Sequence, residues 1–317
     1  LLVYSEGVLK YEAYRFGFDE QKKHLGWSTA KSITTSLLGV AIQEGALNLD
    51  DPVTKYVADA RNTPWDQVSL KHLATMTSGM DFKEVYEASP LNSHVVSMFY
   101  RFPFFQDIAG YIGRLRNVKA APGERFSYSS GDTNMLSRAL HEALGGKERS
   151  LLKEKILDKI GVEKFTFEED GKSTIIGSSY FYATAVDFLK LGILYLNDGK
   201  WDQSQILPMG WAELSRTPGP AFKTLRLDNV PEGKAYGLGF WLNQPVPQAQ
   251  IGKAYSAMPA DAYWMAGHQG QYVIIIPSTQ TVIVRLGRDR SKTNKFDVNG
   301  FFVKLSQALN WKGGVSP

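Results

Sequence analysis

The segment GWSTAKSITTSLLGVAI, residues 26–42, predicts both a central helix and the chemistry beside it. Ser28 and Lys31 are three residues apart in this segment, so on a helix they lie on one face, one turn from each other. From Ile33 onward the segment is apolar, small or uncharged, which is typical of a buried helix. Burial disfavours the ammonium form of a lysine, and a neutral amine can accept a serine proton. The pair therefore predicts an activated serine at the start of a buried helix.

The Ser-x-x-Lys spacing does not identify an active site by itself, because it occurs twice. Ser150 and Lys153 also have this spacing, within a charged and amphipathic stretch that predicts a surface helix. Lys153 is therefore expected to be an ordinary surface charge. A helix-capping serine beside an ordinary lysine is the competing interpretation of Ser28 and Lys31, so the rest of the chain must decide.

The composition narrows the possible functions. The 317 residues allow one large domain or two closely joined ones. The net charge of +4 includes no basic run, so nucleic acid is not an expected partner. The chain has no cysteine, which excludes disulfides, thiolate catalysis and cysteine metal sites. No run of 18 apolar residues occurs, so the sequence predicts no transmembrane segment.

The first residues, LLVYS, are typical of the middle of a strand. We therefore expect that an upstream segment was lost, and a signal peptide would have been lost with it. The compartment stays undetermined from the sequence, with an exported or periplasmic location slightly favoured.

Strand patterns stand at both ends of the chain and helical patterns fill its middle. Strands are expected in a hairpin over residues 1–16 and at 236–241, 262–266, 272–276 and 281–286. Helices are expected at 70–76, 133–144, 149–160, 184–197, 208–216 and 297–311. This order predicts an α/β protein of the α+β type, with one antiparallel sheet built from both termini. Residues 1–50 and 175–317 would form the sheet-containing domain and 51–174 a mostly helical one, with the active site between them.

Residues 81–122 are rich in aromatic side chains and show no clear helical or strand period. A loop of this length and composition predicts a functional wall or lid, or else a satellite cluster packed on the core. The sequence leaves both possibilities open. As a wall, the stretch 99–105, which includes Phe102 and Phe104, would border an acyl pocket and favour apolar acyl groups.

Two further short motifs carry groups suited to proton transfer. Tyr128, followed by Ser129 and Ser130, stands just before a predicted helix, and a tyrosine there can donate and accept a proton. A core tyrosine with a satisfied hydroxyl is the alternative. His268, in the run GHQGQ at residues 267–271, joins two predicted strands and could orient or protonate a leaving group. The adjacent glycines would let a backbone N–H approach an oxyanion, whereas a turn histidine is the alternative.

Several other kinds of site are not indicated. The remaining histidines show no metal-ligand spacing, and the sequence contains no His-Glu-x-x-His, no Gly-x-Ser-x-Gly and no phosphate-binding glycine-rich loop. The sequence therefore predicts neither a metal nor an organic cofactor.

In this order, Ser28-x-x-Lys31, Tyr128-x-Ser130 and His268-Gln-Gly270 resemble the motifs of the serine β-lactamase and penicillin-binding-protein superfamily. The chain looks most like the class C-like branch, and within it like 6-aminohexanoate-dimer hydrolases and related esterases. The resemblance runs nearly from end to end, through residues 73–80, 121–131, 191–201, 267–272 and 282–287.

The resemblance implies a role for each matching residue. Ser28 would be the acylated nucleophile, and Lys31 its base or the electrostatic partner of the base. Tyr128 would pass the proton to the leaving group and later activate water. The backbone N–H groups of Ser28 and Gln271 would form the oxyanion hole.

The resemblance also assigns substrate binding or support to Ser130, His268, Gln269 and Gly270, and two of these positions depart from the family pattern. Class C β-lactamases have asparagine where this chain has Ser130, and Lys-Thr-Gly where it has residues 268–270. Because that lysine and asparagine are linked with the carboxylate and amide of β-lactams, efficient β-lactamase activity is not expected. The sequence shows no clear counterpart of the class A deacylating glutamate.

Together these features predict a serine hydrolase that cleaves a small ester or amide through a Ser28 acyl-enzyme. The alternative within enzymes is a D-alanyl-D-alanine carboxypeptidase or weak β-lactamase. The alternative of another class is a non-catalytic penicillin-binding or sensor domain. The natural substrate, the preference between esters and amides, and the oligomeric state are not determined by the sequence.

Overall fold

The computed structural model describes residues 1–86, 92–223, 233–289 and 295–311. Its main element is a seven-stranded antiparallel sheet in the order β2-β1-β12-β11-β10-β9-β8, which joins both ends of the chain as the sequence predicts. Leu2 pairs with Val284 in this sheet, and Val3 pairs with Ile283. The strands are β1 (Leu2–Ser5), β2 (Val8–Glu12), β8 (Ala235–Tyr236), β9 (Trp241–Leu242), β10 (Tyr263–Gly267), β11 (Gln271–Ile276) and β12 (Thr281–Arg285).

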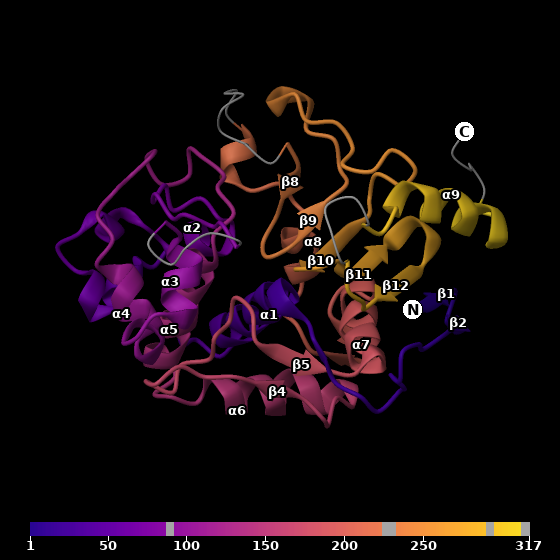
Figure 1. The fold of residues 1–317 in the computed structure, drawn as a ribbon, viewed down its shortest axis with the longest axis horizontal. Coiled ribbons are helices and arrows are strands. Elements are labelled where there is room, and N and C mark those ends of the chain that lie inside the picture. Colours follow the sequence, from indigo (N-terminus) through magenta and orange to yellow (C-terminus); the bar gives the residue numbers. More distant parts are fainter. Residues whose placement is uncertain (87–91, 224–232, 290–294, 312–317) are drawn as a thin grey trace.

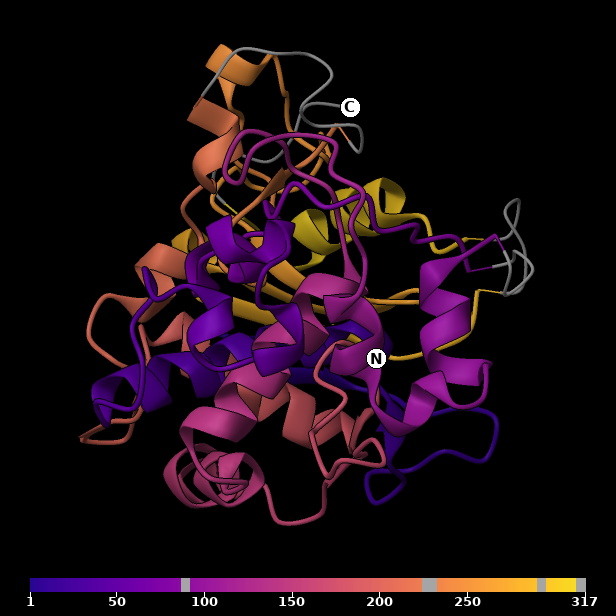
Figure 2. The same ribbon diagram turned by 90° about the vertical axis from the view of Figure 1, so that its left-hand side faces the viewer.

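The interior positions of the central strands are apolar because both faces of the sheet are covered, as in residues 273–276 of β11 and 282–284 of β12. Helix α7 (Ala185–Leu196) packs on one face, where Gly192 lies directly against Val273 and Val282. Helix α9 (Val298–Ala308) covers the other face, where Phe302 packs in a cluster that includes Ile274 and Ile283. Figures 1 and 2 show these two helices on opposite sides of the sheet. Strands buried on both faces lose the usual polar alternation.

The prediction of one continuous strand at 236–241 is wrong, because two short strands, β8 and β9, form there with a turn between them. The chain turns back on itself between them, where the Gly237 N–H donates to the Phe240 carbonyl at 2.8 Å. Gly239 has a φ of +82°, in the left-handed region that glycine adopts freely. Alternating apolar residues in the sequence concealed this tight turn.

Helix α1 (Ala30–Gln43) is buried on all sides from Ala30 to Ala41, which confirms the expected central helix. Its hydroxyl side chains are paired inside the core. Ser32 donates to the Gly239 carbonyl at 2.6 Å, and Ser36 bonds the Tyr195 hydroxyl at 2.8 Å. These hydrogen bonds offset the cost of burying polar groups in the middle of the protein.

Four of the remaining helices, α2 to α5, lie together to the left of the sheet in Figure 1. The expectation of an irregular segment at 81–122 is wrong in part, because two short helices form there, with Ser93 and Asp107 capping their N-termini. Helix α5 begins at Ser130, three residues earlier than predicted, with Ser129 as its cap. The helices are α2 (Leu70–Ala74), α3 (His94–Tyr100), α4 (Ile108–Gly113), α5 (Ser130–Ala143), α6 (Glu148–Leu152) and α8 (Trp211–Ser215).

Two small sheets complete the described fold. One contains β3 (His24–Leu25), β5 (Phe181–Ala183) and β4 (Thr166–Phe167), and it leads directly into the turn before α1. The other pairs β6 (Lys200–Trp201) with β7 (Ser204–Gln205). Within the described ranges, none of the helices combines the length and apolarity needed to cross a membrane.

The contact between Gly192 and the sheet gives a test of this packing. A Cβ at this position would lie 2.5 Å from Val282 Cγ1 and 2.9 Å from Val273 Cγ1. Gly192→Ala should therefore destabilise the protein by about 1–3 kcal/mol, although alanine is the better helix former. Gly252→Ala is the control, because nothing lies within 4 Å of a Cβ there. Chemical denaturation should leave the control within about 0.5 kcal/mol of the wild type. A Gly192→Ala variant as stable as the control would show that the helix can move away.

Candidate active site

Ser28 and Lys31 stand where the chain enters α1, as their spacing predicts. Ser28 lies in a short 3₁₀ turn, Trp27–Thr29, and Lys31 is the second residue of the helix. Lys31 Nζ lies 3.1 Å from Ser28 Oγ. Trp27, immediately before the serine, has a φ of +49°, a conformation that is uncommon for residues other than glycine. The nucleophile candidate therefore sits on a sharp and constrained turn.

The amine of Lys31 has three oxygen partners and almost no contact with solvent. Besides Ser28 Oγ, these are Ser130 Oγ at 3.0 Å and the Ser178 carbonyl at 2.9 Å. An ammonium group has three N–H donors and satisfies all three oxygens. A neutral amine has two donors, which suit Ser130 and Ser178, and its lone pair is then directed to Ser28. The same geometry thus serves both protonation states.

Burial lowers the pKa of Lys31 to about 8, although the nearby negative charge of Glu84 acts in the opposite direction. The cause is that the buried ammonium loses its hydration, which the neutral amine needs less. With this pKa, about a tenth of the molecules carry a neutral lysine at pH 7. Lys31 can therefore accept a proton from Ser28 at a pH where an exposed lysine could not.

Helix α5 positions two of the oxygens around Lys31. Ser130 is its first residue, and Asn134, one turn later, holds Ser178 through two hydrogen bonds. The Asn134 amide donates to Ser178 Oγ at 3.0 Å and accepts from the Ser178 N–H at 3.3 Å. Sequence reasoning missed Ser178, because it acts through its backbone carbonyl and belongs to no side-chain motif.

Tyr128 presents the face of its ring to the Lys31 amine. Lys31 Nζ is 4.9 Å from the ring centroid, in cation–π geometry. The ring stacks on Trp241 at a centroid distance of 5.1 Å and meets Tyr236 edge to face at 6.0 Å. The aromatic residues of β8 and β9 therefore fix the orientation of Tyr128 at the start of α5.

Two residues of the segment before α3 also reach the site, and neither was expected from the sequence as a site residue. Glu84 accepts hydrogen bonds from Ser130 Oγ at 2.6 Å and from the Ser130 N–H at 2.9 Å. Tyr86 donates to Glu84 at 2.5 Å, and its hydroxyl also hydrogen-bonds Ser28. Burial, followed by the charge of Glu84, raises the pKa of Tyr86, so this phenol stays protonated. The aromatic composition of the segment was the only signal in the sequence.

His268 reaches the site through ring contacts. Its imidazole lies 5.6 Å from Trp27, edge to face, and 5.2 Å from Tyr86. The carbonyl of Gln269 accepts the Asp289 N–H at 3.0 Å, and the carbonyl of Gly270 accepts from Arg285. These bonds hold the tight turn between β10 and β11 against the segment that follows β12.

The start of β11 is held beside the turn that carries Ser28. Gly267 pairs with Gln271 across the β10–β11 hairpin, and a Cβ on Gly267 would lie 2.1 Å from the Gly26 carbonyl. The Gln271 side chain is also bound at both ends, accepting the Gly287 N–H at 2.9 Å and donating to the Gly287 carbonyl. This close approach agrees with an oxyanion hole formed by the backbone of Ser28 and Gln271, which stays a prediction.

The second Ser-x-x-Lys pair has a different environment. Lys153 is exposed and binds both carboxylate oxygens of Asp158 at 2.7 Å. Its amine is therefore an ordinary surface cation, as expected. Among the residues that the structure describes, no group of three or more histidine or carboxylate side chains could hold a metal ion.

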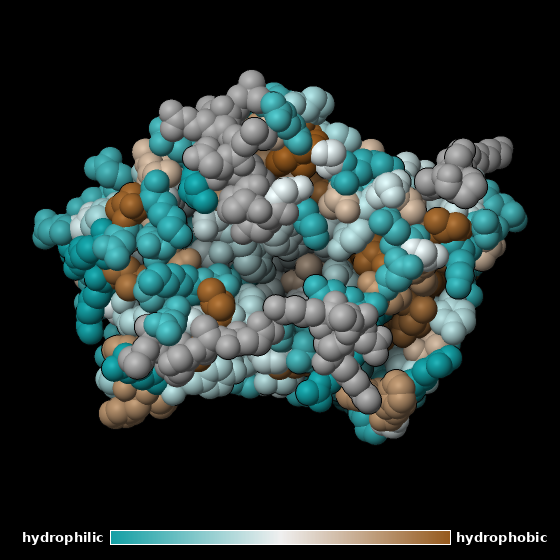
Figure 3. Space-filling view, turned by 45° about the horizontal axis from the view of Figure 1, so that its top comes forward, coloured by the Kyte–Doolittle hydropathy of each residue, from teal (hydrophilic) through white to brown (hydrophobic). Residues whose placement is uncertain are grey.

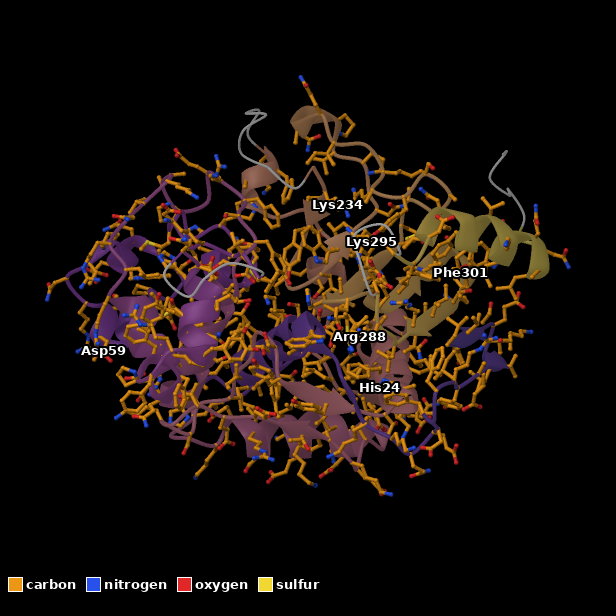
Figure 4. All side chains as sticks on the ribbon, viewed as in Figure 1. His24, Asp59, Lys234, Arg288, Lys295 and Phe301 are labelled. Atoms are coloured by element: carbon orange, nitrogen blue, oxygen red, sulfur yellow. The ribbon has the colours of Figure 1, made fainter. Side chains whose placement is uncertain are left out.

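The surroundings of the site are mixed in character. The face in Figure 3 is hollowed near its centre, and hydrophilic residues cover much of its outer part. In Figure 4, Lys234, Lys295 and Arg288 lie on the sheet side of the middle of the molecule. Burial, followed by the charge of Lys295, lowers the pKa of Lys234.

The arrangement of a serine, a buried lysine and a tyrosine on this fold agrees with the family comparison. A model of the Beta-lactamase family matches residues 1–306, so the chain belongs to this family. Solved structures share the fold. A penicillin-binding protein homologue from Pyrococcus abyssi, described as octameric, superposes with a TM-score of 0.71 at 18% identity, covering 98% of this chain and 72% of that one. A penicillin-binding protein from Bacillus halodurans gives a TM-score of 0.69 at 15% identity over 97% and 95% of the two chains.

Sequence relatives include enzymes with different printed activities. A 6-aminohexanoate-dimer hydrolase from Paenarthrobacter ureafaciens is 26% identical over 66% of this chain and 54% of its own length. The D-alanyl-D-alanine-carboxypeptidase/endopeptidase AmpH from Escherichia coli K12 is 25% identical over 56% of this chain and 50% of its own. The matched region thus spans about half the length of these curated relatives.

The pKa of Lys31 predicts how the reactivity of Ser28 depends on pH. Below about pH 8 the lysine is mostly protonated and cannot accept the serine proton, so reactivity should rise with pH and level off above this value. The measurement is the rate of labelling by a fluorophosphonate between pH 5.5 and 9.5. Lys31→Met should lower the plateau by about 10²–10⁴-fold and remove the inflection. A wild-type profile that is flat across pH 8 would contradict the assignment.

Proposed function

We propose that this protein is a serine hydrolase that cleaves a small ester or amide through an acyl-enzyme on Ser28. The observation that carries the proposal is the buried Lys31 amine, held between Ser28, Ser130 and the Ser178 carbonyl. An ordinary structural lysine would extend to solvent or pair with a carboxylate, as Lys153 does. Here the amine faces a serine instead, which is the arrangement of a base and its nucleophile.

In the first step, neutral Lys31 accepts the proton of Ser28 Oγ while this oxygen attacks the carbonyl carbon of the substrate. The carbonyl oxygen becomes an oxyanion, which the N–H groups of Ser28 and Gln271 would stabilise. Each such donor is worth about 3–4 kcal/mol in acyl transfer. When the tetrahedral intermediate collapses, the bond to the leaving group breaks and the serine ester remains.

The leaving group needs a proton, and we assign its delivery to Tyr128, which lies next to Lys31. Its ring lies 4.9 Å from Lys31 Nζ. In this proposal the phenol gives its proton to the leaving group and regains the proton that Lys31 took from Ser28. In the second half-reaction the path runs backwards. Tyr128 passes its phenol proton to Lys31 and accepts one from the water that attacks the ester. The bond between the acyl carbon and Ser28 Oγ then breaks, and Lys31 returns the proton to Ser28. Neither a metal nor an organic cofactor enters this sequence of steps.

Two observations favour small esters or amides as substrates over β-lactams. The relative with the printed name 6-aminohexanoate-dimer hydrolase aligns over 66% of this chain. In addition, residue 268 is a histidine between the rings of Trp27 and Tyr86, where true class C β-lactamases have a lysine. An imidazole between aromatic rings offers a β-lactam carboxylate less positive charge than an ammonium does. Carboxypeptidase activity is the second candidate, supported by the match to AmpH.

Mass spectrometry after fluorophosphonate treatment tests the nucleophile directly. The wild type should gain one adduct, and Ser28→Ala should gain none. Ser150→Ala is the matched control, because Ser150 belongs to the other Ser-x-x-Lys pair, and it should label like the wild type. Absence of an adduct on the wild type would mean that Ser28 is not activated and would overturn the proposed function.

Turnover then separates an enzyme from a slow penicillin-binding or sensor domain. The protein should release many equivalents of p-nitrophenol from a p-nitrophenyl ester. A burst that stops at one equivalent would favour the non-catalytic alternative.

Ring contacts suggest where apolar acyl groups would bind. Phe99 meets Tyr180 edge to face at 5.1 Å, and Tyr180 lies 6.0 Å from Trp27, next to the nucleophile. Phe104 instead stacks on Tyr111 at 4.3 Å, and Phe102 is largely exposed. These contacts support Phe99 as the part of the stretch 99–105 that borders the acyl group.

Acyl-chain preference tests this part of the proposal. Phe99→Ala should reduce kcat/KM for p-nitrophenyl octanoate by about tenfold relative to the acetate, because the longer chain loses an apolar partner. Phe102→Ala, at an exposed position of the same stretch, is the control and should keep the wild-type ratio. An unchanged ratio in Phe99→Ala would show that the stretch is a satellite cluster with no role in binding.

A further inference from the structure

Five side chains form a closed ring of hydrogen bonds around the candidate nucleophile. Lys31 donates to Ser28 and to Ser130, and Ser130 donates to Glu84. Tyr86 also donates to Glu84, and its hydroxyl returns to Ser28 through a further hydrogen bond. Lys31 is the cationic donor of this ring and Glu84 its anionic acceptor. The Ser130 hydroxyl separates the two charges on one side of the ring, and the hydroxyls of Ser28 and Tyr86 separate them on the other.

We propose that Glu84 is a positioning residue for the acyl-transfer reaction, which holds Ser130 and Tyr86 in place and sets the electrostatic potential at Lys31. This inference rests on the proposed function, because it assumes that Lys31 activates Ser28. Glu84 acts on the nucleophile through Ser130, Tyr86 and Lys31.

The hydrogen bonds of Ser130 show how Glu84 directs the lysine. The Ser130 hydroxyl has one proton, which it donates in a hydrogen bond to Glu84. Ser130 Oγ can therefore only accept a hydrogen bond from Lys31. One N–H of Lys31 is therefore committed to Ser130, and the Ser178 carbonyl commits a second. In the neutral amine this leaves the lone pair facing Ser28. Without an acceptor at Glu84, the Ser130 hydroxyl could rotate and donate to the lysine nitrogen, which would block the base.

The position of the carboxylate also suits its charge. Glu84 accepts the Ser130 N–H at 2.9 Å at the first residue of α5, a 14-residue helix whose N-terminus favours negative charge. The charge of Glu84 raises the pKa of Lys31 and so opposes the effect of burial. Loss of this charge should therefore move the pKa of Lys31 further below its present value.

Other groups face the same region and must stay constant in a test. The Tyr128 ring lies under Lys31 Nζ, and His268 packs on Tyr86. Asp132, on α5, is bound to Ser78 and Ser129, and burial raises its pKa to about 7. These residues are the same in every Glu84 variant. The charge of Glu84 also raises the pKa of Asp132, so its removal should lower the pKa of Asp132 as well as that of Lys31, and the difference between Glu84→Gln and Glu84→Asp reports the loss of this charge.

The experiment measures the pH profile of fluorophosphonate labelling for two substitutions of Glu84 in the full chain. Glu84→Gln removes the charge but keeps the shape, so the inflection near pH 8 should move at least 0.5 pH unit lower, and the plateau should fall about tenfold. Glu84→Asp keeps the charge but shortens the side chain, so the inflection should stay in place while the plateau falls. The exposed Glu154→Gln is the matched control and should reproduce the wild-type profile.

Each result either supports the inference or contradicts it. A Glu84→Gln profile that superposes on the wild type, that moves to higher pH, or that only loses amplitude would overturn it, since a merely structural role does not displace the inflection. If Glu84→Gln does not fold, Glu84→Asp provides the test. A shift of its inflection away from the wild-type pH would overturn the inference. Failure of the proposed function is distinguishable, because the wild type itself would then gain no adduct.

Discussion

The burial of one amine, that of Lys31, is the constraint on which the site depends. An ammonium group is costly to bury, and the protein reduces this cost by giving Lys31 three oxygen partners and the face of an aromatic ring. Burial nevertheless lowers the pKa of this lysine to about 8. The burial that disfavours the charged state therefore leaves part of the lysine as a neutral amine near pH 7, which is the form that can accept a serine proton.

The scaffold can be understood as the means of holding this amine in place. Lys31 stands in the first turn of the buried helix α1. Helix α5 supplies Ser130, and its Asn134 holds Ser178, whose carbonyl accepts from Lys31. The covered sheet holds the β10–β11 turn against the turn before α1, where Gly267 meets the Gly26 carbonyl. The three groups of candidate site residues are far apart in the sequence, so a loss of packing between these elements would move Ser28 and Lys31 away from Ser130, from the Ser178 carbonyl and from the start of β11.

Local patterns predicted much of the fold and part of the site. The N-terminal hairpin, the buried α1 and the sheet that joins both termini were expected, because strong apolar patterns and turn residues specify them locally. The same reasoning placed one strand at 236–241, where Gly237 and Gly239 produce a turn, and expected no helices in residues 81–122. Both errors arise where the local pattern is weak and packing against distant residues selects the conformation.

By itself, the sequence determined which residues could react: a serine and a lysine one turn apart on an apolar helix, a tyrosine before a second helix, and a histidine in a glycine-flanked turn. These features follow from residue type and spacing alone, because the local geometry of a helix or turn fixes how nearby side chains are placed. Only the tertiary structure decided that Glu84, Tyr86 and the Ser178 carbonyl complete the surroundings of Ser28. Charge, burial and hydrogen bonding between distant segments exist only after folding, so no local pattern could reveal them.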